Sequence, residues 1–408
     1  MDANATTPVL PEVLDAMRPF WTEAFGNASS IHQQGQHARA AVDRARESVA
    51  ALLGCRAAEV VFTSGGTESD NLALFGILAP GDHLITSSME HAAVMHAAEA
   101  LAGRGVEVTF LPCTAQGVVE GSALEAALRP NTRLVSVMLA NNETGVLQPV
   151  RELADRAHAA GALFHTDAVQ AAGKLALDVK ALGCDLLSLS GHKMYAPQGV
   201  GALFVRRNVR LRSIFFGGNH ERGRRPGTEN VAGIVGLGSA AELARTWLAN
   251  GDSSGALRHK QAEHEGIAGQ RLAPDSPQAL AALRDRLEQG IVAQVEEAGV
   301  NGAGATRVSN TSNLYFDHVE AEALVIALDL KGLAVSGGSA CQSGATEPSH
   351  VLTAMGLSPA RARASVRFSL SRLTTEEEVD CALELVPATV ARLRKLSPLY
   401  RKAIAARE

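Results

Sequence analysis

A lysine stands just past the end of an apolar strand, where a primary amine can do chemistry. Residues 185–193 read DLLSLSGHK, and the predicted strand 185–189 is followed closely by Lys193. The carboxyl ends of parallel strands face the crevice in which open α/β sheets bind ligands. An amine there can form a Schiff base with an aldehyde cofactor or a carbonyl substrate. Most lysines are instead solvated surface residues, so this interpretation of Lys193 needs support from other residues.

An aspartate lies two residues past an earlier predicted strand, 162–165. A buried carboxylate at the position of Asp167 could keep a pyridine nitrogen protonated, which deepens the electron sink of pyridoxal phosphate. The alternative is that Asp167 caps the helix that follows it. Taken with Lys193, the aspartate favours a pyridoxal phosphate site.

Two short segments have the composition of a phosphate site. The loop 64–67, SGGT, follows a strand and opens a helix, so its backbone N–H groups and the helix dipole can receive a phosphate. Ser190 and His192 can bind the same group. A glycine-rich turn is also common with no ligand, but no G-x-G-x-x-G stands at a first βα junction, which disfavours a dinucleotide.

One of the five cysteines lies in a run of small residues, 337–344, GGSACQSG. A loop of this composition allows its thiol to move, so Cys341 could act as a sulfur nucleophile and carrier. The alternative is a small buried core thiol, which is the common fate of a free cysteine. That alternative suits the other four cysteines, whose neighbours are mainly apolar or helical: Cys55, Cys113, Cys184 and Cys381.

The elements that must position these residues alternate between helix and strand from about residue 36 to 205. Such alternation predicts an α/β fold with a mostly parallel sheet covered by helices. The turn-rich patch 250–255 predicts a boundary, with a large domain of residues 14–250 and a smaller α+β domain of residues 1–13 and 251–408. The expected helices are 36–53 (with Gly54 as C-cap), the segment after the loop 64–67 through Leu78, 92–103, 123–128, 150–160 and 260–300; the expected strands are 59–63, 83–87, 106–111, 134–139, 162–165, 185–189, 201–205, 308–316 and 365–370.

Composition sets limits on partners and compartment. The 408 residues carry a formal net charge of −5 and no long basic run, which argues against nucleic acid as a main partner. The cysteines are odd in number and lack CxxC spacing, so we expect a reducing cytoplasm rather than a disulfide framework or structural zinc site. The polar opening and the short apolar runs predict neither a signal peptide nor a membrane span.

Ordered motifs along nearly the whole chain resemble the cysteine desulfurases, which are fold-type I pyridoxal phosphate enzymes of the class V aminotransferase group. The matching stretches are ATTP (5–8), GN (26–27), FTSGGTESDN (62–71), EH (90–91), NNETG (141–145), DAVQ (167–170), SGHK (190–193), GRRPGT (223–228), SAC (339–341) and RFSLS (367–371). The cysteine segment is similar to the long-loop type. Ala28 departs from the family, which often has proline there.

The resemblance implies a role for each matching residue. Lys193 would carry the cofactor as a Schiff base, Asp167 would pair with the pyridine nitrogen, and Gln170 would bind the ring hydroxyl. His91 would stack on the ring and shuttle protons. The phosphate would be held by Gly66, Thr67, Ser190 and His192, with Thr228 supplied by the second subunit of a homodimer. Asn142 would contact cofactor and substrate, and the substrate's carboxylate would be bound by Asn142 and Arg367, with Asn27 also at the substrate site.

The reaction implied is a sulfurtransferase reaction, the conversion of L-cysteine to L-alanine. The sulfur would pass to Cys341 as a persulfide and then to an acceptor protein, such as a scaffold for iron–sulfur cluster assembly, or into thiolation. Cys341 could also ligate an iron–sulfur cluster transiently, which would be its only metal-binding role. Two alternatives keep the cofactor, a selenocysteine lyase and an aminotransferase, and a third is a non-catalytic scaffold. The presence of Cys341 together with Lys193, Asp167 and His91 favours the desulfurase.

Overall fold

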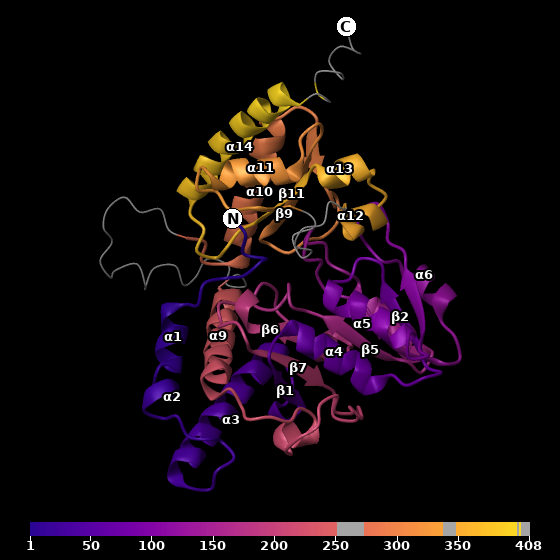
Figure 1. The fold of residues 1–408 in the computed structure, drawn as a ribbon, viewed down its shortest axis with the longest axis vertical. Coiled ribbons are helices and arrows are strands. Elements are labelled where there is room, and N and C mark those ends of the chain that lie inside the picture. Colours follow the sequence, from indigo (N-terminus) through magenta and orange to yellow (C-terminus); the bar gives the residue numbers. More distant parts are fainter. Residues whose placement is uncertain (251–272, 338–347, 398–399, 401–408) are drawn as a thin grey trace.

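The computed structural model describes residues 1–250, 273–337, 348–397 and 400. Two sheets organise these residues (Figure 1): a large one in the lower body and a small one in the upper body, where α14 and the N-terminal segment also lie. The predicted α/β architecture, a mostly parallel sheet with a smaller α+β part, is confirmed.

The large sheet has seven strands in the order β1-β7-β6-β5-β4-β2-β3. From β3 to β6 neighbouring strands are parallel, whereas β7 runs antiparallel to both β6 and β1. The antiparallel strand has a simple cause, because the connection from β6 to β7 is too short for the crossover that a parallel pair needs. The strands are β1 (Val60–Thr63), β2 (His83–Ser87), β3 (Glu107–Leu111), β4 (Thr132–Ser136), β5 (Leu163–Asp167), β6 (Leu186–Ser190) and β7 (Gly201–Val205).

Helices cover both faces of this sheet, and successive strand residues point to opposite faces. Leu186 packs with α4 (Gly66–Ile77) and α5 (Ala92–Ala102) on one face. Leu187 packs on the other face, which is covered by α1 (Pro11–Met17), α3 (Gln33–Leu53), α7 (Val150–Ala159) and α9 (Val231–Ala249). Burial on both faces explains the continuous apolar runs of these strands. The remaining helices of this part are α2 (Pro19–Thr22), α6 (Gly121–Ala127), α8 (Val179–Leu182) and the short 3₁₀ turns Ala57–Glu59, Gly191–Lys193 and His220–Gly223.

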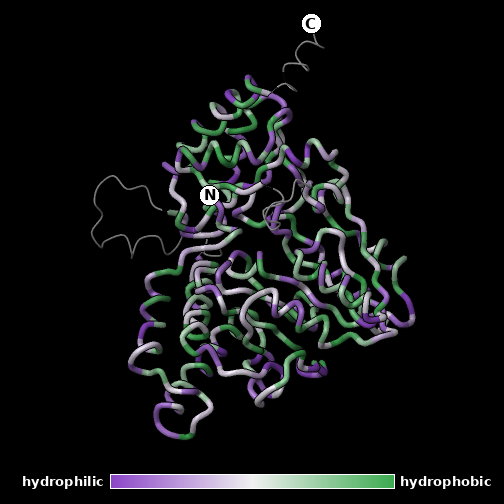
Figure 2. Tube along the Cα trace, viewed as in Figure 1, coloured by the Kyte–Doolittle hydropathy of each residue, from purple (hydrophilic) through white to green (hydrophobic). Residues whose placement is uncertain are grey.

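The small sheet has the order β10-β11-β9-β8 and is antiparallel throughout. Its apolar core includes side chains from α10, α11 and α14, and Figure 2 shows hydrophobic stretches running through the interior of both bodies. The elements are α10 (Pro277–Gln294), β8 (Ala298–Val300), β9 (Thr311–Phe316), α11 (Ala321–Asp329), β10 (Ser336–Gly337), α12 (His350–Ala354), α13 (Pro359–Arg363), β11 (Ser365–Ser369) and α14 (Glu376–Leu396).

Several predicted boundaries were wrong, and local capping explains the main one. Helix was expected over 260–300, but the described part of this range holds α10, which begins at Pro277 after the cap Ser276 and ends at Gln294, and then β8. Residues 260–272 lie outside the described chain. Strand 134–139 is instead β4 at Thr132–Ser136, and strand 308–316 begins only at Thr311. By contrast, α3 ends at Leu53 with Gly54 in the left-handed conformation (φ 66°), as predicted.

The first residues of the chain lie against the small sheet. Asp2 forms a bridge with Ser369 of β11, and the N–H of Ala3 donates to the carbonyl of Ser369 at 2.9 Å. A segment from late in the chain lies against the large sheet in turn: Val351 and Leu352 of α12 pack into the core of that sheet. The division into residues 14–250 against 1–13 and 251–408 stays a prediction. No described helix is long and apolar enough to cross a membrane.

Candidate active site

A cavity of about 320 Å³ lies at the carboxyl ends of the central strands. Its walls include every predicted cofactor residue except Thr228, together with Arg367 of β11. The lining residues are Asn4, Ala5, Gly66, Thr67, Asp70, His91, Met138, Ala140, Asn142, Asp167, Val169, Gln170, Ser190, His192, Lys193 and Arg367. The large sheet, the small sheet and the first residues of the chain therefore all contribute to one site.

Lys193 reaches the cavity from the 3₁₀ turn that follows β6. Its Nζ donates to the main-chain carbonyls of Asn4 and Ala5, both at 2.6 Å. The turn depends on a glycine, because a Cβ on Gly191 would lie 3.0 to 3.1 Å from Val200 and Ala196. The amine is therefore held at the edge of the cavity by two neutral acceptors.

Asp167 is the last residue of β5 and is almost fully buried. Its Oδ1 accepts a hydrogen bond from the N–H of Val169 at 2.8 Å. Burial raises the pKa of this carboxyl, and the positive charges of His91 and Lys193 act in the opposite direction. A buried carboxylate of this kind suits a cationic N–H donor in the cavity.

His91 caps α5, and its Nδ1 accepts a hydrogen bond from the N–H of Ala93 at 3.1 Å. Burial lowers the pKa of the imidazole, Asp167 raises it, and Lys193 lowers it further. Because Nδ1 accepts, the neutral ring carries its proton on Nε2. His91 thus lines the cavity as a neutral ring whose Nε2–H is a hydrogen-bond donor.

The first turn of α4 forms one corner of the cavity and has no side-chain cap. The backbone is tightly packed there, since a Cβ on Gly66 would lie 2.7 Å from Val169 Cγ2. Ser190 lies at the same corner, since a Cβ on Gly66 would be 3.6 Å from Ser190 Cβ, and His192 lines the same cavity. Backbone N–H groups at a helix N-terminus, beside a hydroxyl and an imidazole, fit a phosphate.

Arg367 and Asn142 also line the cavity, and each carries a buried polar atom without a hydrogen-bond partner among the described residues: Arg367 Nε and Asn142 Oδ1. The guanidinium donates through Nη1 to the carbonyl of Asn142 and through Nη2 to Asp2 Oδ1, at 3.0 and 2.8 Å. Buried polar groups are normally satisfied, so a ligand that offers a carboxylate to Arg367 and an N–H or O–H group to Asn142 would satisfy both residues.

Three predicted residues are not placed in the cavity. Asn27 is exposed, and its Oδ1 accepts from the N–H of Ser29 at 2.9 Å. Thr228 is exposed in the loop before α9. Cys341 lies outside the described residues, but both flanks of its segment approach the site. Ser336 pairs with Arg367 in the small sheet, and Ser349 donates to Glu143, next to Asn142, at 2.6 Å.

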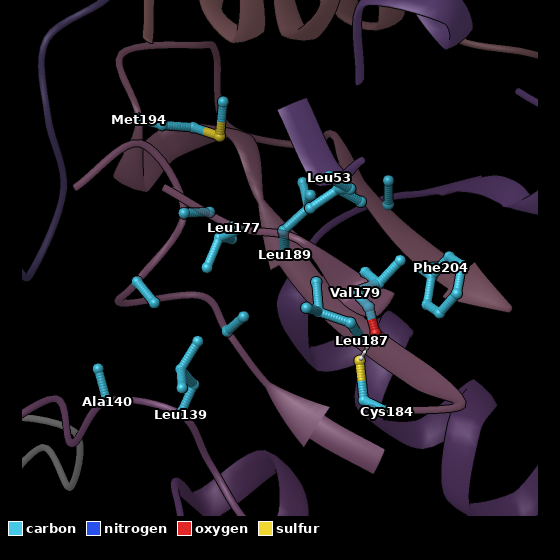
Figure 3. Close-up of a cluster of buried hydrophobic side chains, with 14 of the residues drawn as sticks. Leu53, Leu139, Ala140, Leu177, Val179, Cys184, Leu187, Leu189, Met194 and Phe204 are labelled. Carbon is cyan, nitrogen blue, oxygen red and sulfur yellow. Dashed lines mark hydrogen bonds between the residues drawn. The ribbon is translucent and has the colours of Figure 1, made fainter. Parts of the chain in front are cut away.

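The other four cysteines differ in burial. Cys184 is buried among Val179, Leu187 and other apolar side chains, and its thiol lies 4.0 Å from the carbonyl of Val179 (Figure 3). Cys55 and Cys113 are half-buried, whereas Cys381 is exposed. The interpretation of Cys381 as a core thiol was therefore wrong, because it lies on the outer face of α14 while its neighbours Val379 and Ala382 point inward.

Several polar residues around the cavity were not recognised from the sequence. Asn4 and Asp70 line it, and Lys174 and Glu90 lie behind it, all four buried. Burial raises the pKa of Asp70 well above its usual range, and the charge of Asp167 adds to this. Asp70 lies in the matching stretch 62–71 but was given no role, and its other sequence signal is an acidic residue on the apolar side of a helix. Lys174 and Asn4 give no signal, because their burial depends on segments distant in sequence.

Comparison with known proteins identifies the family. The model of the aminotransferase class-V family matches residues 1–272 and 275–381. The chain belongs to this family. Among its relatives, it is 50% identical over 98% of its length to the cysteine desulfurase IscS of Anaeromyxobacter sp. strain Fw109-5 and 47% identical to cysteine desulfurase 2 of Trichormus variabilis, in each case covering 94% of the relative.

Solved structures agree with this class-V assignment. A NifS-like protein superimposes with a TM-score of 0.84 at 33% identity, with 96% of this chain and 99% of that one covered. The structure of SspA in complex with cysteine superimposes with a TM-score of 0.75 at 35% identity, with 92% and 99% covered. Within the class-V family, the chain groups with the cysteine desulfurases.

Pyridoxal phosphate is the cofactor of this class-V protein, and the cavity fits it. The uncapped α4 N-terminus fits the phosphate, the buried Asp167 carboxylate fits a protonated ring nitrogen, and the Lys193 amine fits the aldehyde. The residues that would hold the group are Gly66, Thr67, His91, Asp167, Gln170, Ser190, His192 and Lys193. These roles stay predictions; the structure shows only that the residues line one cavity.

Proposed function

We propose that this protein is a cysteine desulfurase that converts L-cysteine to L-alanine and receives the sulfur on Cys341 as a persulfide. The main support is that the Arg367 guanidinium, a group suited to a carboxylate, lines the same cavity as Lys193 and Asp167. An amino acid could therefore be held by its carboxylate while its amine faces the lysine. The relatives named cysteine desulfurases, and the neighbour solved with cysteine, support L-cysteine as that amino acid.

Bound pyridoxal phosphate supplies a carbonyl for the substrate amine and an electron sink for the carbon that loses a proton. Asp167 holds the proton at the ring nitrogen, and Gln170 donates to the ring oxygen. Arg367 and Asn142 orient the substrate through its carboxylate. His91, with its proton on Nε2, can donate a hydrogen bond within the cavity. It acts as an acid only after its ring has taken up a second proton and become the imidazolium.

Cys341 performs the sulfur transfer. Its thiolate attacks the sulfur of the substrate, so an S–S bond forms while the bond between Cβ and sulfur breaks. The electron pair of the broken bond stays with carbon, which takes up a proton to become the methyl group of alanine. Overall, one thiol and one cysteine give one persulfide and one alanine, so no external oxidant or reductant is required.

We further propose that the persulfide is passed to an acceptor protein, for iron–sulfur cluster assembly or thiolation, and that Cys341 can ligate such a cluster transiently. The relatives named IscS support the cluster assignment. A reducing cytoplasm would suit a protein that depends on a free thiol.

The test of the reaction uses the purified protein with pyridoxal phosphate, L-cysteine and a reductant. We expect alanine and sulfide in equal amounts. Incubation with selenocysteine, or with alanine and a 2-oxo acid, measures the two alternative activities. Alanine formed only from selenocysteine, or amine transfer without sulfide, would contradict the proposal.

We also propose a homodimer in which Thr228 of one chain completes the phosphate site of the other. Thr228 is exposed and outside its own cavity, which is compatible with a role in a partner's site. The test is a mixed dimer of a Thr228→Ala chain and a Lys193→Ala chain. One of its two sites would be fully intact, so it should bind cofactor at that site with wild-type affinity.

The matched control for the mixed dimer places both substitutions in one chain, paired with a wild-type chain. The one site that keeps Lys193 would then receive alanine instead of Thr228 from the partner chain, and its affinity for the cofactor should fall. Equal affinities in the two mixed dimers, or a monomer that binds cofactor tightly, would refute the role of Thr228 across the interface.

A further inference from the structure

A buried lysine lies behind the cavity without lining it. Lys174 follows β5 in the chain and is only 7% exposed. Its Nζ donates to Gln170 Oε1 at 2.7 Å and to Asn4 Oδ1 at 2.9 Å. Lysine is seldom buried unless it is paired with an acid, yet both acceptors here are neutral amide oxygens. A lysine in this position therefore calls for a functional explanation.

The surroundings favour the neutral form of this amine. Burial lowers the pKa of Lys174 well below its usual range, and the nearby positive charges of Lys193 and Arg367 lower it further. The amine donates its two hydrogen bonds, to Gln170 and Asn4, whether it carries two or three hydrogens. Lys174 is therefore a fixed donor to both acceptors.

These bonds determine which way the Gln170 amide faces. An amide has one oxygen that accepts and one NH₂ group that donates. Oε1 accepts from Lys174, while Nε2 donates to the main-chain carbonyl of Asn4 at 3.1 Å. A carbonyl can only accept, so turning the amide over would place two oxygens against each other. Both contacts therefore select the same orientation, in which Nε2 keeps a second hydrogen for another acceptor.

We propose that Lys174 is a positioning residue that fixes the Gln170 amide so that its NH₂ group donates to an oxygen of the bound cofactor. Gln170 lines the cavity and makes the contact, whereas Lys174 acts only through it. Asn4 strengthens the arrangement, because its carbonyl accepts from both Gln170 and Lys193. The proposal rests on pyridoxal phosphate being the occupant of the cavity.

The test is a double-mutant cycle read out by the affinity of the apoprotein for pyridoxal phosphate and by the visible absorbance band of the complex. Lys174→Met keeps the length of the side chain but removes its donors. We expect it to weaken binding about tenfold, the effect of about one hydrogen bond, and to shift the band. In a Gln170→Met background the same substitution should have no further effect, because the residue on which Lys174 acts is gone.

Two further variants make the result specific. Lys331→Met removes a lysine whose Nζ donates to Thr389 Oγ1 at 2.9 Å in the small domain, and it should leave cofactor affinity unchanged. Lys174→Gln retains an N–H donor and should bind within about twofold of wild type. If Lys174→Met does not fold, Lys174→Gln is the deciding variant. A loss of cofactor affinity in Lys174→Gln as large as the loss in Gln170→Met would overturn the proposal.

The remaining outcomes separate this proposal from the assignment of the cofactor. The positioning role would be refuted if Lys174→Met bound the cofactor with wild-type affinity. It would also be refuted if Lys174→Met lowered cofactor affinity equally in the wild-type and Gln170→Met backgrounds. In both cases the cofactor assignment would stand. Failure of the wild-type protein to bind pyridoxal phosphate would refute both.

Discussion

The guanidinium of Arg367 donates to the main-chain oxygen of Asn142 at 3.0 Å. Arg367 lies on β11 of the small sheet, whereas Asn142 follows β4 of the large sheet. The two residues expected to bind the substrate's carboxylate are therefore in direct contact across the two sheets. A small displacement between the sheets would change both at once.

Replacing Arg367 with lysine should weaken substrate binding more than it affects the cofactor. The substitution keeps the charge but loses the planar fork that grips a carboxylate with two N–H groups. We expect KM for L-cysteine to rise about 10- to 100-fold, from the loss of about 1.5–3 kcal/mol of charge-assisted hydrogen bonding, with cofactor absorbance unchanged. Arg361→Lys, which alters the ion pair with Asp317, is the control. An unaltered KM in Arg367→Lys would exclude this role.

Removal of the Lys193 amine should abolish the reaction. Lys193→Ala is expected to lose the visible absorbance of the lysine-linked cofactor and all alanine production, because no other described amine lines the cavity. Spectra and amino-acid analysis measure the two effects. Lys180→Ala, at an exposed position, should behave as wild type. Alanine formation at the normal rate in Lys193→Ala would show that the chemistry does not depend on this amine.

Cys341→Ser should separate cofactor binding from sulfur transfer. The cofactor absorbance should persist, whereas persulfide formation should stop, since a hydroxyl is a far poorer nucleophile toward sulfur than a thiolate. Burial raises the pKa of Cys55 and Cys184 to about 12 and that of Cys113 above its usual value, so these three thiols remain protonated. Mass spectrometry after incubation with cysteine should find the added sulfur on the Cys341 peptide.

The matched controls for that experiment are Cys113→Ser and Cys381→Ser, the second at an exposed position. Both should form the persulfide normally. Sulfur found on another cysteine, or normal turnover in Cys341→Ser, would show that Cys341 is not the carrier.

Glu143 should make the protein less stable as pH rises. Burial raises the pKa of its carboxyl to about 7, although the hydrogen bond from Ser349 and the charge of Arg367 act in the opposite direction. The folded state therefore binds this proton more tightly than the unfolded state, whose pKa is 4.5. The free energy of unfolding should fall as pH rises from about 4.5 to 7, by at most roughly 3 kcal/mol from this residue.

Urea unfolding of Glu143→Gln at about pH 5 and about pH 8 checks this contribution. The difference between the two pH values should be smaller in the variant than in wild type. Glu288→Gln is the control, because pairing with Arg307 and Ser312 outweighs burial and lowers the pKa of Glu288. The stability that ionised Glu288 contributes is already complete above pH 4.5 and is lost only as the pH falls below that value. The same pH dependence in wild type and Glu143→Gln would contradict the prediction.

The sequence predicted the cavity residues well where a motif follows a buried strand. Asp167 ends β5, Ser190 ends β6, and the glycine loop opens α4, so strand position alone brought these residues to one edge of the sheet. The direction of β7 was not predicted from composition, because a strand buried on both faces has the same composition whether it is parallel or antiparallel. The available signal was the short connection between the expected strands 185–189 and 201–205, which favours an antiparallel pair.

Buried polar partners were the part that the sequence did not predict. Lys174 has the composition of a surface residue, and its burial arises because Asn4, 170 residues earlier in the chain, packs over it. Asp70 and Glu90 are similar cases, since an acidic residue in a helix or turn is usually exposed. Such groups are specified by contacts between distant segments, which a local pattern does not contain.

The bridge between Asp2 and Ser369 also means that the site cannot form until β11 has been synthesised. The N–H of Asn4 donates to the hydroxyl of Ser369, 365 positions away in the chain, and the carbonyl of Asn4 holds Lys193. Because β11 follows all the strands of the large sheet in the chain, that sheet is synthesised before the segment that completes the cavity. Capture of the cofactor should therefore require synthesis past β11, and a chain that stops before this strand should bind pyridoxal phosphate more weakly.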